Sequence, residues 1–225
     1  MLIHNRHIYY LPFYFQAVKG TSAEGSGIRT IPYLGSIILS SIVAGAGVTM
    51  LGYFKPFMIA GSSIFTLGAG MLYTLKVNST AGKWIGYQIL SGFGAGFGVQ
   101  MPFIAVQVVL NNKDMPTGNA MAIFFNSLGG AISISIAQNI FSNGLSTNLP
   151  KYAPEVSAEG VINAGATHLR EYVKPELLAG VLKAYMVALG QAYVIPIAVG
   201  GIATICACFV EWKSVKGKKI VAAAA

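Results

Sequence analysis

The sequence predicts an all-α membrane protein of six transmembrane helices, the first of them truncated. Of its 225 residues, 54% are hydrophobic and only 10% are charged, whereas charged residues make up about a quarter of a typical soluble domain. Its mean hydropathy is +0.62. Five stretches are long and apolar enough to cross the hydrocarbon core of a bilayer, which requires about 20 residues of helix.

The expected spans cover residues 8–18, 31–54, 57–75, 84–110, 120–141 and 185–209. The first is about half the length that a span requires, and the polar segment His4–His7 precedes it. We interpret it as a real span without its first half, in a chain that begins inside a larger protein. The connections are short except for residues 142–183, a polar loop in which Pro175–Lys183 is expected to form an amphipathic helix.

The tail, residues 212–225, sets the predicted orientation. Lys213, Lys216, Lys218 and Lys219 cluster there, and basic flanks of transmembrane helices stay in the cytoplasm. Counting back from this basic cytoplasmic tail places the loop 142–183 outside the cell. The only glycosylation sequon, which begins at Asn78, also falls on the predicted outer side. The net charge of +8 is otherwise thinly spread, so we expect the lipid bilayer and no nucleic acid as a partner.

Ionisable side chains within a span usually mark ion paths or catalytic groups, and the middle of each expected span contains no acid. Cys206 and Cys208 are two residues apart, so on a helix their side chains point in different directions. The sequence therefore indicates no enzyme, no metal site and no cofactor.

Uncharged polar and aromatic side chains are the candidates for binding a solute. In the fourth span, Gln100 and Gln107 share a stripe of about 60° with Gly96 and Phe103, and Pro102 interrupts the helix beside it. The candidate substrate-binding residues are Tyr10, Phe13, Tyr14, Gln16, Gln100, Gln107, Asn126 and Gln138. The alternative for each is a packing contact between helices, so both interpretations stay open.

The order and spacing of several short motifs are specific. They are Tyr9–Gly20, Gly52–Pro56 with Ile59–Gly61, Gly82–Leu90 with its glycine-rich continuation to Gln100, Asp114 with Gly118, Phe125, Gly129–Gly130, Ser135–Gln138, and Glu211–Val215. Together they resemble the C-terminal half of fourteen-span drug:proton antiporters of the major facilitator superfamily, in the fungal multidrug and toxin efflux branch. The match covers nearly the whole chain from Tyr9.

The resemblance implies that the six spans form one half-bundle of the facilitator fold. The first, second, fourth and fifth spans would line a central cavity, and the third and sixth would support them. Lys55 and Asp114 would lie in neighbouring cytoplasmic turns, where they could make a gating contact; Asp114 could instead cap the fifth helix through its carboxylate. The proton-coupling residues of the family lie in the other half of the transporter.

We therefore expect a half of a facilitator-type transporter that exports a small amphipathic organic solute, with proton antiport in the complete protein. Such carriers rock two halves around a midplane site, so the expected partner is a missing N-terminal half or a second copy of this chain. The expected location is the plasma membrane or, alternatively, a vacuolar membrane. The competing hypothesis is a truncated membrane protein that inserts or associates but transports nothing.

Overall fold

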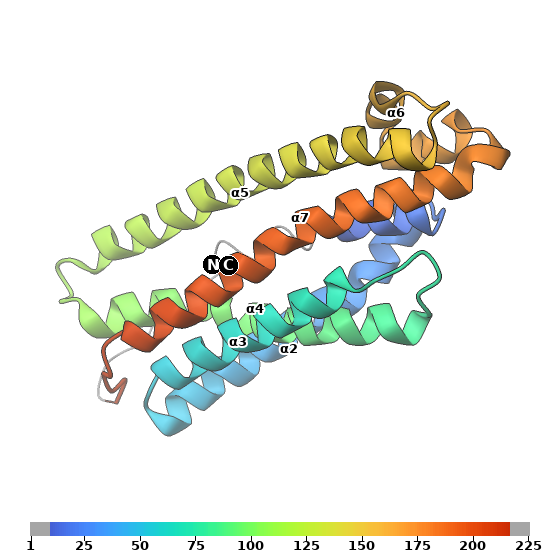
Figure 1. Cartoon of the computed structure of the whole chain (residues 1–225). Coiled ribbons are helices and arrows are strands. Elements are labelled where there is room, and N and C mark those ends of the chain that lie inside the picture. Colours follow the sequence, from blue (N-terminus) through green and yellow to red (C-terminus); the bar gives the residue numbers. More distant parts are fainter. Residues whose placement is uncertain (1–9, 217–225) are drawn as a thin grey trace.

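The computed structural model describes residues 10–216, and most of these residues are helical (Figure 1). The elements are the π-helix η1 (Tyr14–Val18) and the α-helices α2 (Ala23–Leu51), α3 (Lys55–Tyr73), α4 (Ala81–Val109), α5 (Met115–Tyr152), α6 (Ala158–Tyr172) and α7 (Pro175–Phe209). Within residues 10–216 there is no β-strand. One helical turn, from Tyr10 to Phe13, precedes η1. Residues 10–20 are called the first segment below.

Five helices are long and apolar enough to cross a membrane: α2, α3, α4, α5 and α7. The surfaces of these helices that face away from the bundle are apolar, as shown by the exposed side chains of Ile38 and Ile42 on α2 and of Ile202 and Ile205 on α7. The prediction of an all-α membrane half-bundle is therefore confirmed. Residues 8 and 9 of the expected first span lie outside the described residues, so the length of that span stays a prediction.

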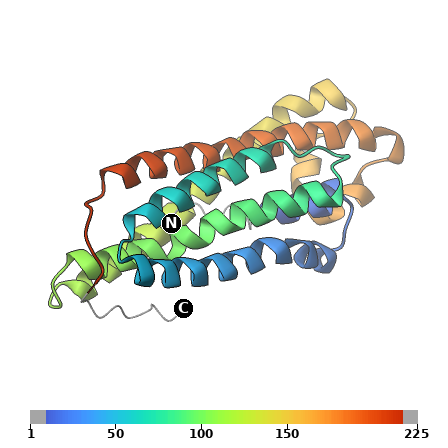
Figure 2. The same ribbon diagram turned by 90° about the horizontal axis from the view of Figure 1, so that it is seen from below.

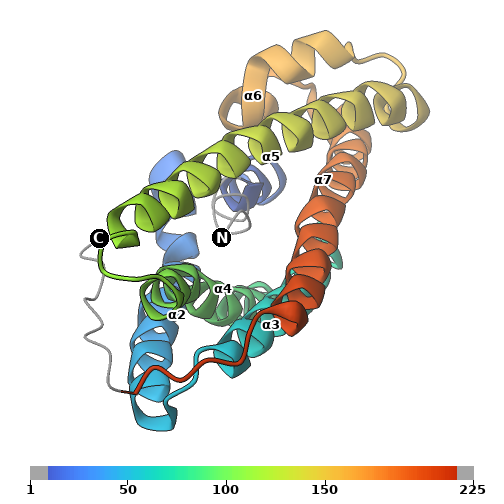
Figure 3. The same ribbon diagram turned by 90° about the vertical axis from the view of Figure 1, so that its left-hand side faces the viewer.

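The long helices pack in the order α2, α4, α3, α7, α5, each against the next. Viewed from one end, they form an arc that is open between α2 and α5 (Figure 3). The first segment lies on the concave side, near the end that carries α6 (Figures 1 and 3). Phe15 stacks edge-on against Trp84 of α4 with 4.9 Å between ring centroids, which ties the first segment into the arc.

The expected polar loop 142–183 is wrong as a loop, because most of it is helical. α5 continues to Tyr152, α6 follows, and Pro175–Lys183 forms the first turns of the long helix α7 and no separate helix. Polar residues end an apolar span, but a helix continues beyond it where one face is buried. Here Leu145 and Leu149 of α5 and Val181 of α7 supply that buried face.

Glycines of α4 allow its backbone to touch two neighbours at once. A Cβ at Gly94 would collide with the backbone of Phe65 in α3, and a Cβ at Gly92 would lie 2.5 Å from the carbonyl oxygen of Tyr33 in α2. Gly96 lies equally close to α2 at Ile37. Small residues at such contacts are typical of membrane helices, since van der Waals packing is one of the main forces that holds them together.

The C-terminal residues return to the turn between α2 and α3. The backbone N–H of Val215 donates to the carbonyl oxygen of Gly52 at 2.8 Å, and Tyr53 stacks near Trp212 with 5.7 Å between ring centroids. Gly52 has a φ of 79°, a left-handed conformation that ends α2. This contact brings together two motifs, Gly52–Pro56 and Glu211–Val215, that lie far apart in the sequence (Figure 2).

Replacing Gly94 with alanine should destabilise the bundle, because the new methyl group would overlap the backbone of Phe65. The cost of such overpacking is about 1–3 kcal/mol, measured as a lower unfolding midpoint in detergent. Gly86→Ala is the matched control on the same helix, because nothing lies within 4 Å of its added Cβ. Equal midpoints for the two variants would contradict the packing argument.

The predicted topology places α6 outside the cell. A single cysteine at the exposed position Asn163, in a background of Cys206→Ala and Cys208→Ala, should react with a membrane-impermeant maleimide added to intact cells. A cysteine at the exposed position Asn112, in the turn between α4 and α5, should react only after the cells are permeabilised. The opposite labelling pattern would invert the topology.

Candidate functional site

Aromatic side chains of the first segment meet α5 and α7 in a cluster on the concave side of the arc. The ring centroids of Tyr10 and Phe13 lie 6.1 Å and 6.0 Å from that of Phe141, and the Phe141 ring lies 5.0 Å from Tyr185. The Tyr10 hydroxyl donates to Oε1 of Gln138 at 3.4 Å. The structure thus joins three of the predicted residues, Tyr10, Phe13 and Gln138, in one aromatic cluster with a single amide.

Tyr14 and Gln16 contact other parts of the protein. The buried hydroxyl of Tyr14 donates to the carbonyl oxygen of Lys76 in the α3–α4 connection at 3.1 Å. The Thr167 hydroxyl of α6 donates to Oε1 of Gln16 at 2.8 Å. In this conformation both side chains attach the first segment to neighbouring elements. The proposed role of either in binding a solute would need these contacts to open.

The remaining predicted residues lie on α4 and α5, away from that cluster. Gln107 is only 7% exposed, whereas Gln100 and Asn126 are half-buried. Within residues 10–216, no hydrogen bond joins Gln100 or Asn126 to the aromatic cluster. At one end of the predicted stripe on α4, the Ser41 hydroxyl of α2 donates to the carbonyl oxygen of Gly96 at 3.2 Å. That end of the stripe therefore packs against α2.

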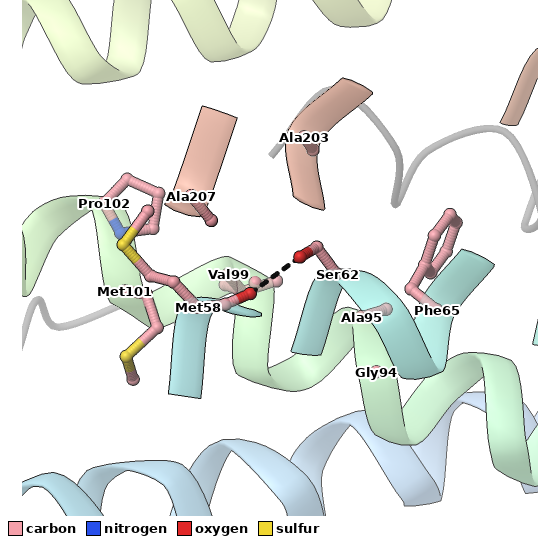
Figure 4. Close-up of a pocket in the computed structure, with 11 residues that line it drawn as sticks. Met58, Ser62, Phe65, Gly94, Ala95, Val99, Met101, Pro102, Ala203 and Ala207 are labelled. Carbon is pink, nitrogen blue, oxygen red and sulfur yellow. Dashed lines mark hydrogen bonds between the residues drawn. The ribbon is translucent and has the colours of Figure 1, made fainter. Parts of the chain in front are cut away.

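A cavity of about 80 Å³ lies between α3, α4 and α7 (Figure 4). Its walls are apolar, and the hydroxyl of Ser62 is occupied by a hydrogen bond of 2.8 Å to the carbonyl oxygen of Met58. The residues that line it are Met58, Ser62, Phe65, Gly94, Ala95, Gly98, Val99, Met101, Pro102, Ala203 and Ala207. None of the eight predicted residues is among them. The only hint in the sequence was the run of small residues around Gly94 and Gly98.

Lys55 and Asp114, the candidates for gating or capping, lie at the starts of α3 and α5. The Lys55 ammonium donates to the carbonyl oxygen of Cys208 at 2.8 Å and lies 5.6 Å from the centroid of the Trp212 ring. Lys55 thus neutralises the negative end of α7. Asp114 occupies the N-cap position of α5, but its side chain forms no capping hydrogen bond. The described ion pairs do not include one between Lys55 and Asp114.

The end of the bundle that carries α6 is cross-linked by two cations. Arg170 of α6 donates from its guanidinium to the carbonyl oxygens of Ala17 and Val18, at 3.3 Å and 2.7 Å. Lys19 donates to the carbonyl oxygens of Val77 and Ser79, at 2.7 Å and 2.8 Å. Burial, and secondarily repulsion from Arg29, lower the pKa of Lys19. The first segment is thereby tied both to α6 and to the α3–α4 connection.

No group of three or more His, Cys, Asp and Glu side chains within residues 10–216 could hold a metal ion. The eight candidate side chains are instead amides and aromatic rings on the first segment, α4 and α5.

Over nearly its whole length the chain is similar to transporters and efflux pumps of fungi. It is 46% identical to the efflux pump roqT of Penicillium rubens over 93% of this chain and 39% of that protein. It is 43% identical to the MFS-type transporter astH of Aspergillus oryzae, over 94% of this chain and 38% of that protein. The Aspyridones efflux protein of Neocamarosporium betae is 41% identical over 94% of this chain and 38% of that protein.

The resemblance to major facilitator efflux transporters is therefore confirmed. The chain spans about two fifths of the length of these relatives. Together with the five apolar helices, the similarity makes it an integral, multi-pass membrane protein. No protein-family description matches the chain, and neither does any solved structure.

Arg170→Gln should loosen the end of the first segment, because the carbonyl oxygens of Ala17 and Val18 would lose their charged donor. Hydrogen bonds to exposed cations contribute about 1 kcal/mol. Amide hydrogen exchange at Lys19 to Thr21 should accelerate several-fold, while exchange in α3 stays unchanged. Lys151→Gln, at an exposed position on α5, is the control. Unchanged exchange in the Arg170 variant would show that this cross-link does not hold the segment.

Proposed function

We propose that this chain is one half of a major facilitator efflux transporter, and that the complete transporter exports a small amphipathic organic solute by proton antiport from the cytoplasm. The observation that carries the proposal is the similarity to a fungal efflux pump and a fungal MFS-type transporter over more than nine-tenths of the chain. The uncharged aromatic and amide groups of the bundle support the substrate class, because such groups suit apolar solutes with a few hydrogen-bonding atoms.

The proposed solute-binding residues are Tyr10, Phe13, Tyr14, Gln16, Gln100, Gln107, Asn126 and Gln138. In this proposal the first segment, α2, α4 and α5 face the solute path, while α3 and α7 support them. Gating through Lys55 and Asp114 remains part of the proposal. The half-buried amides of Gln100 and Asn126 are the most direct candidates, since a partner bundle or a solute could still reach them.

The proposed assembly requires a second bundle, because alternating access needs two units that rock against each other. That second bundle is either a preceding N-terminal half, which would also supply proton coupling, or a second copy of this chain. The exposed apolar surface of α5, with Met121, Phe125 and Leu128, offers contact area to it or to lipid. The proposed location is the plasma membrane, with a vacuolar membrane as the alternative, and the proposal includes no catalytic activity.

A chimera tests the transport proposal directly. In it, this chain replaces the matching 39% of the Penicillium rubens relative, and the chimera is expressed in yeast without its own drug pumps. We expect efflux of amphipathic dyes that depends on the proton gradient and disappears with an uncoupler. A correctly targeted chimera without dye efflux would favour the competing function, a membrane protein that inserts but transports nothing.

This chain alone should not perform proton-driven export. Every acid of the sequence lies at a helix end, in a connection or in α6, whereas proton coupling uses a titratable group that is exposed alternately to the two sides. The purified chain in liposomes with a pH gradient should therefore leave amphipathic dyes where they are. Dye movement that is abolished by an uncoupler and absent from empty liposomes would contradict this prediction.

Gln100→Ala and Asn126→Ala in the chimera should change the efflux of some dyes and leave protein abundance unchanged. If both amides only join helices, abundance should instead fall modestly, since hydrogen bonds between membrane helices contribute about 0.6 kcal/mol on average. Ser135→Ala, at an exposed position on α5, is the control. An equal loss of efflux for all dyes, in proportion to abundance, would assign both amides to packing.

A further inference from the structure

A second cavity, of about 450 Å³, opens on the surface at the end of the bundle that carries α6. One side of it is a single face of α7, where Lys183, Met186 and Val187 have the spacing i, i+3, i+4. Residues 75–78 of the α3–α4 connection and Tyr152 at the end of α5 complete the lining. A cavity of this volume is large enough for a small ligand or the headgroup of a larger one.

Close helix contacts hold the walls of this cavity in place. A Cβ at Gly180 of α7 would collide with the carbonyl oxygen of Tyr152, so the end of α5 rests directly on α7. A Cβ at Gly190 would lie 3.6 Å from the ring of Tyr73, at the end of α3. The backbone of Lys76 is fixed as well, because its carbonyl oxygen accepts the hydrogen bond from the first segment. The cavity is therefore set by the packing of three elements around α7.

Two lysines at the cavity carry charges that nothing in the described part of the chain neutralises. Lys76 and Lys183 both line it and both are exposed, and neither belongs to a described ion pair. The described lining contains no Asp or Glu. By contrast, Lys19 and Lys55 donate to backbone carbonyls, and Lys213 is paired with an acid. Because a lysine stem is long and flexible, both ammonium groups can reach one anion in the cavity.

The cavity lies where the bundle passes from the membrane into water. The half-exposed rings of Tyr73 and Tyr152 lie beside it, and tyrosines are enriched at the level of lipid headgroups. Val187, which lines the cavity, shares a face of α7 with the exposed side chains of Val194 and Ile205. An apolar stripe thus runs from the cavity along the membrane-spanning part of α7.

We infer that this cavity binds the headgroup of an anionic phospholipid. Lys76 and Lys183 neutralise the headgroup, and an acyl chain lies along Val187 and Val194 on the outer surface of α7. A lipid uses both features, whereas a soluble anion would leave the apolar stripe unused. A zwitterionic lipid would bring its own cation and gain less from the two lysines. The bound lipid would bridge the α3–α4 connection and α7.

This inference goes beyond the proposed function and does not depend on it, because a bundle that transports nothing would offer the same cavity. Native mass spectrometry of the purified chain in an uncharged detergent tests it. The probes are dioleoyl phosphatidylglycerol and dioleoyl phosphatidylcholine, which share their acyl chains and differ in headgroup charge. We expect the chain to retain phosphatidylglycerol with a dissociation constant about tenfold lower than that for phosphatidylcholine. Equal retention of the two lipids would overturn the inference.

Glycerol 3-phosphate, which has the phosphate without the acyl chains, separates a lipid site from a site for soluble anions. At the same concentration as phosphatidylglycerol, it should leave the retained lipid in place. Displacement of the lipid by this compound would show that the apolar stripe contributes nothing, and would overturn the assignment to a phospholipid.

A double variant, Lys76→Gln with Lys183→Gln, should retain one phosphatidylglycerol molecule fewer than the natural chain, because both charges of the cavity are gone. The matched control is Lys151→Gln with Lys174→Gln, which removes two exposed lysines at the same end of the bundle that do not line the cavity. The control should retain the lipid, and so should Lys76→Arg with Lys183→Arg. Equal loss in the cavity variant and the control would reduce the effect to general surface charge and refute the site.

If the double variant does not fold, Lys183→Gln alone, with Lys174→Gln as its control, gives the same decision through a several-fold weaker retention. The transport experiment fails separately from this one. Lack of dye efflux by the chimera, with the preference for phosphatidylglycerol retained by the chain, would count against transport and leave this site standing.

Discussion

The close contact of α4 with α2 and α3 is the constraint on which the rest of the structure depends. Lipid is as apolar as the side chains that face it, so burial from water cannot hold these helices together. Gly92 and Gly96 let α4 approach the backbone of α2, and Gly94 does the same for α3. With α4 held between two helices, α3 can pack against α7, and α7 against α5.

The ends of the bundle are held by a different interaction, the donation of cationic side chains to backbone carbonyls. Arg170 and Lys19 do this at the end that carries α6, and Lys55 does it at the end of α7. These cations lie near helix ends, where water and the helix dipole favour a positive charge. The apolar middle can then consist of uncharged helices whose relative movement would not separate ion pairs.

The first segment contacts both the interior of the bundle and the end of the bundle that carries α6. Its rings pack against Trp84 and Phe141 in the interior, and Phe141 in turn packs against Tyr185. Tyr14 and Lys19 attach the segment to the α3–α4 connection. It also contains the π-helix η1, a wider turn that is frequent at functional sites. A movement of this segment would therefore alter the aromatic cluster and the contacts of α6 together.

The sequence by itself determined the class of protein, because apolar length, low charge and a basic tail depend on local composition. It also determined the small-residue stripes, since glycines at helical spacing leave few alternatives to close packing. Only the tertiary structure decided which face of α4 meets which neighbour. Gly96 packs against α2, while Ala95 and Pro102 line a cavity that no local pattern marks. Likewise, only packing shows that residues 142–183 continue as helices, because the apolar partners that bury Leu149 and Val181 come from elsewhere in the chain.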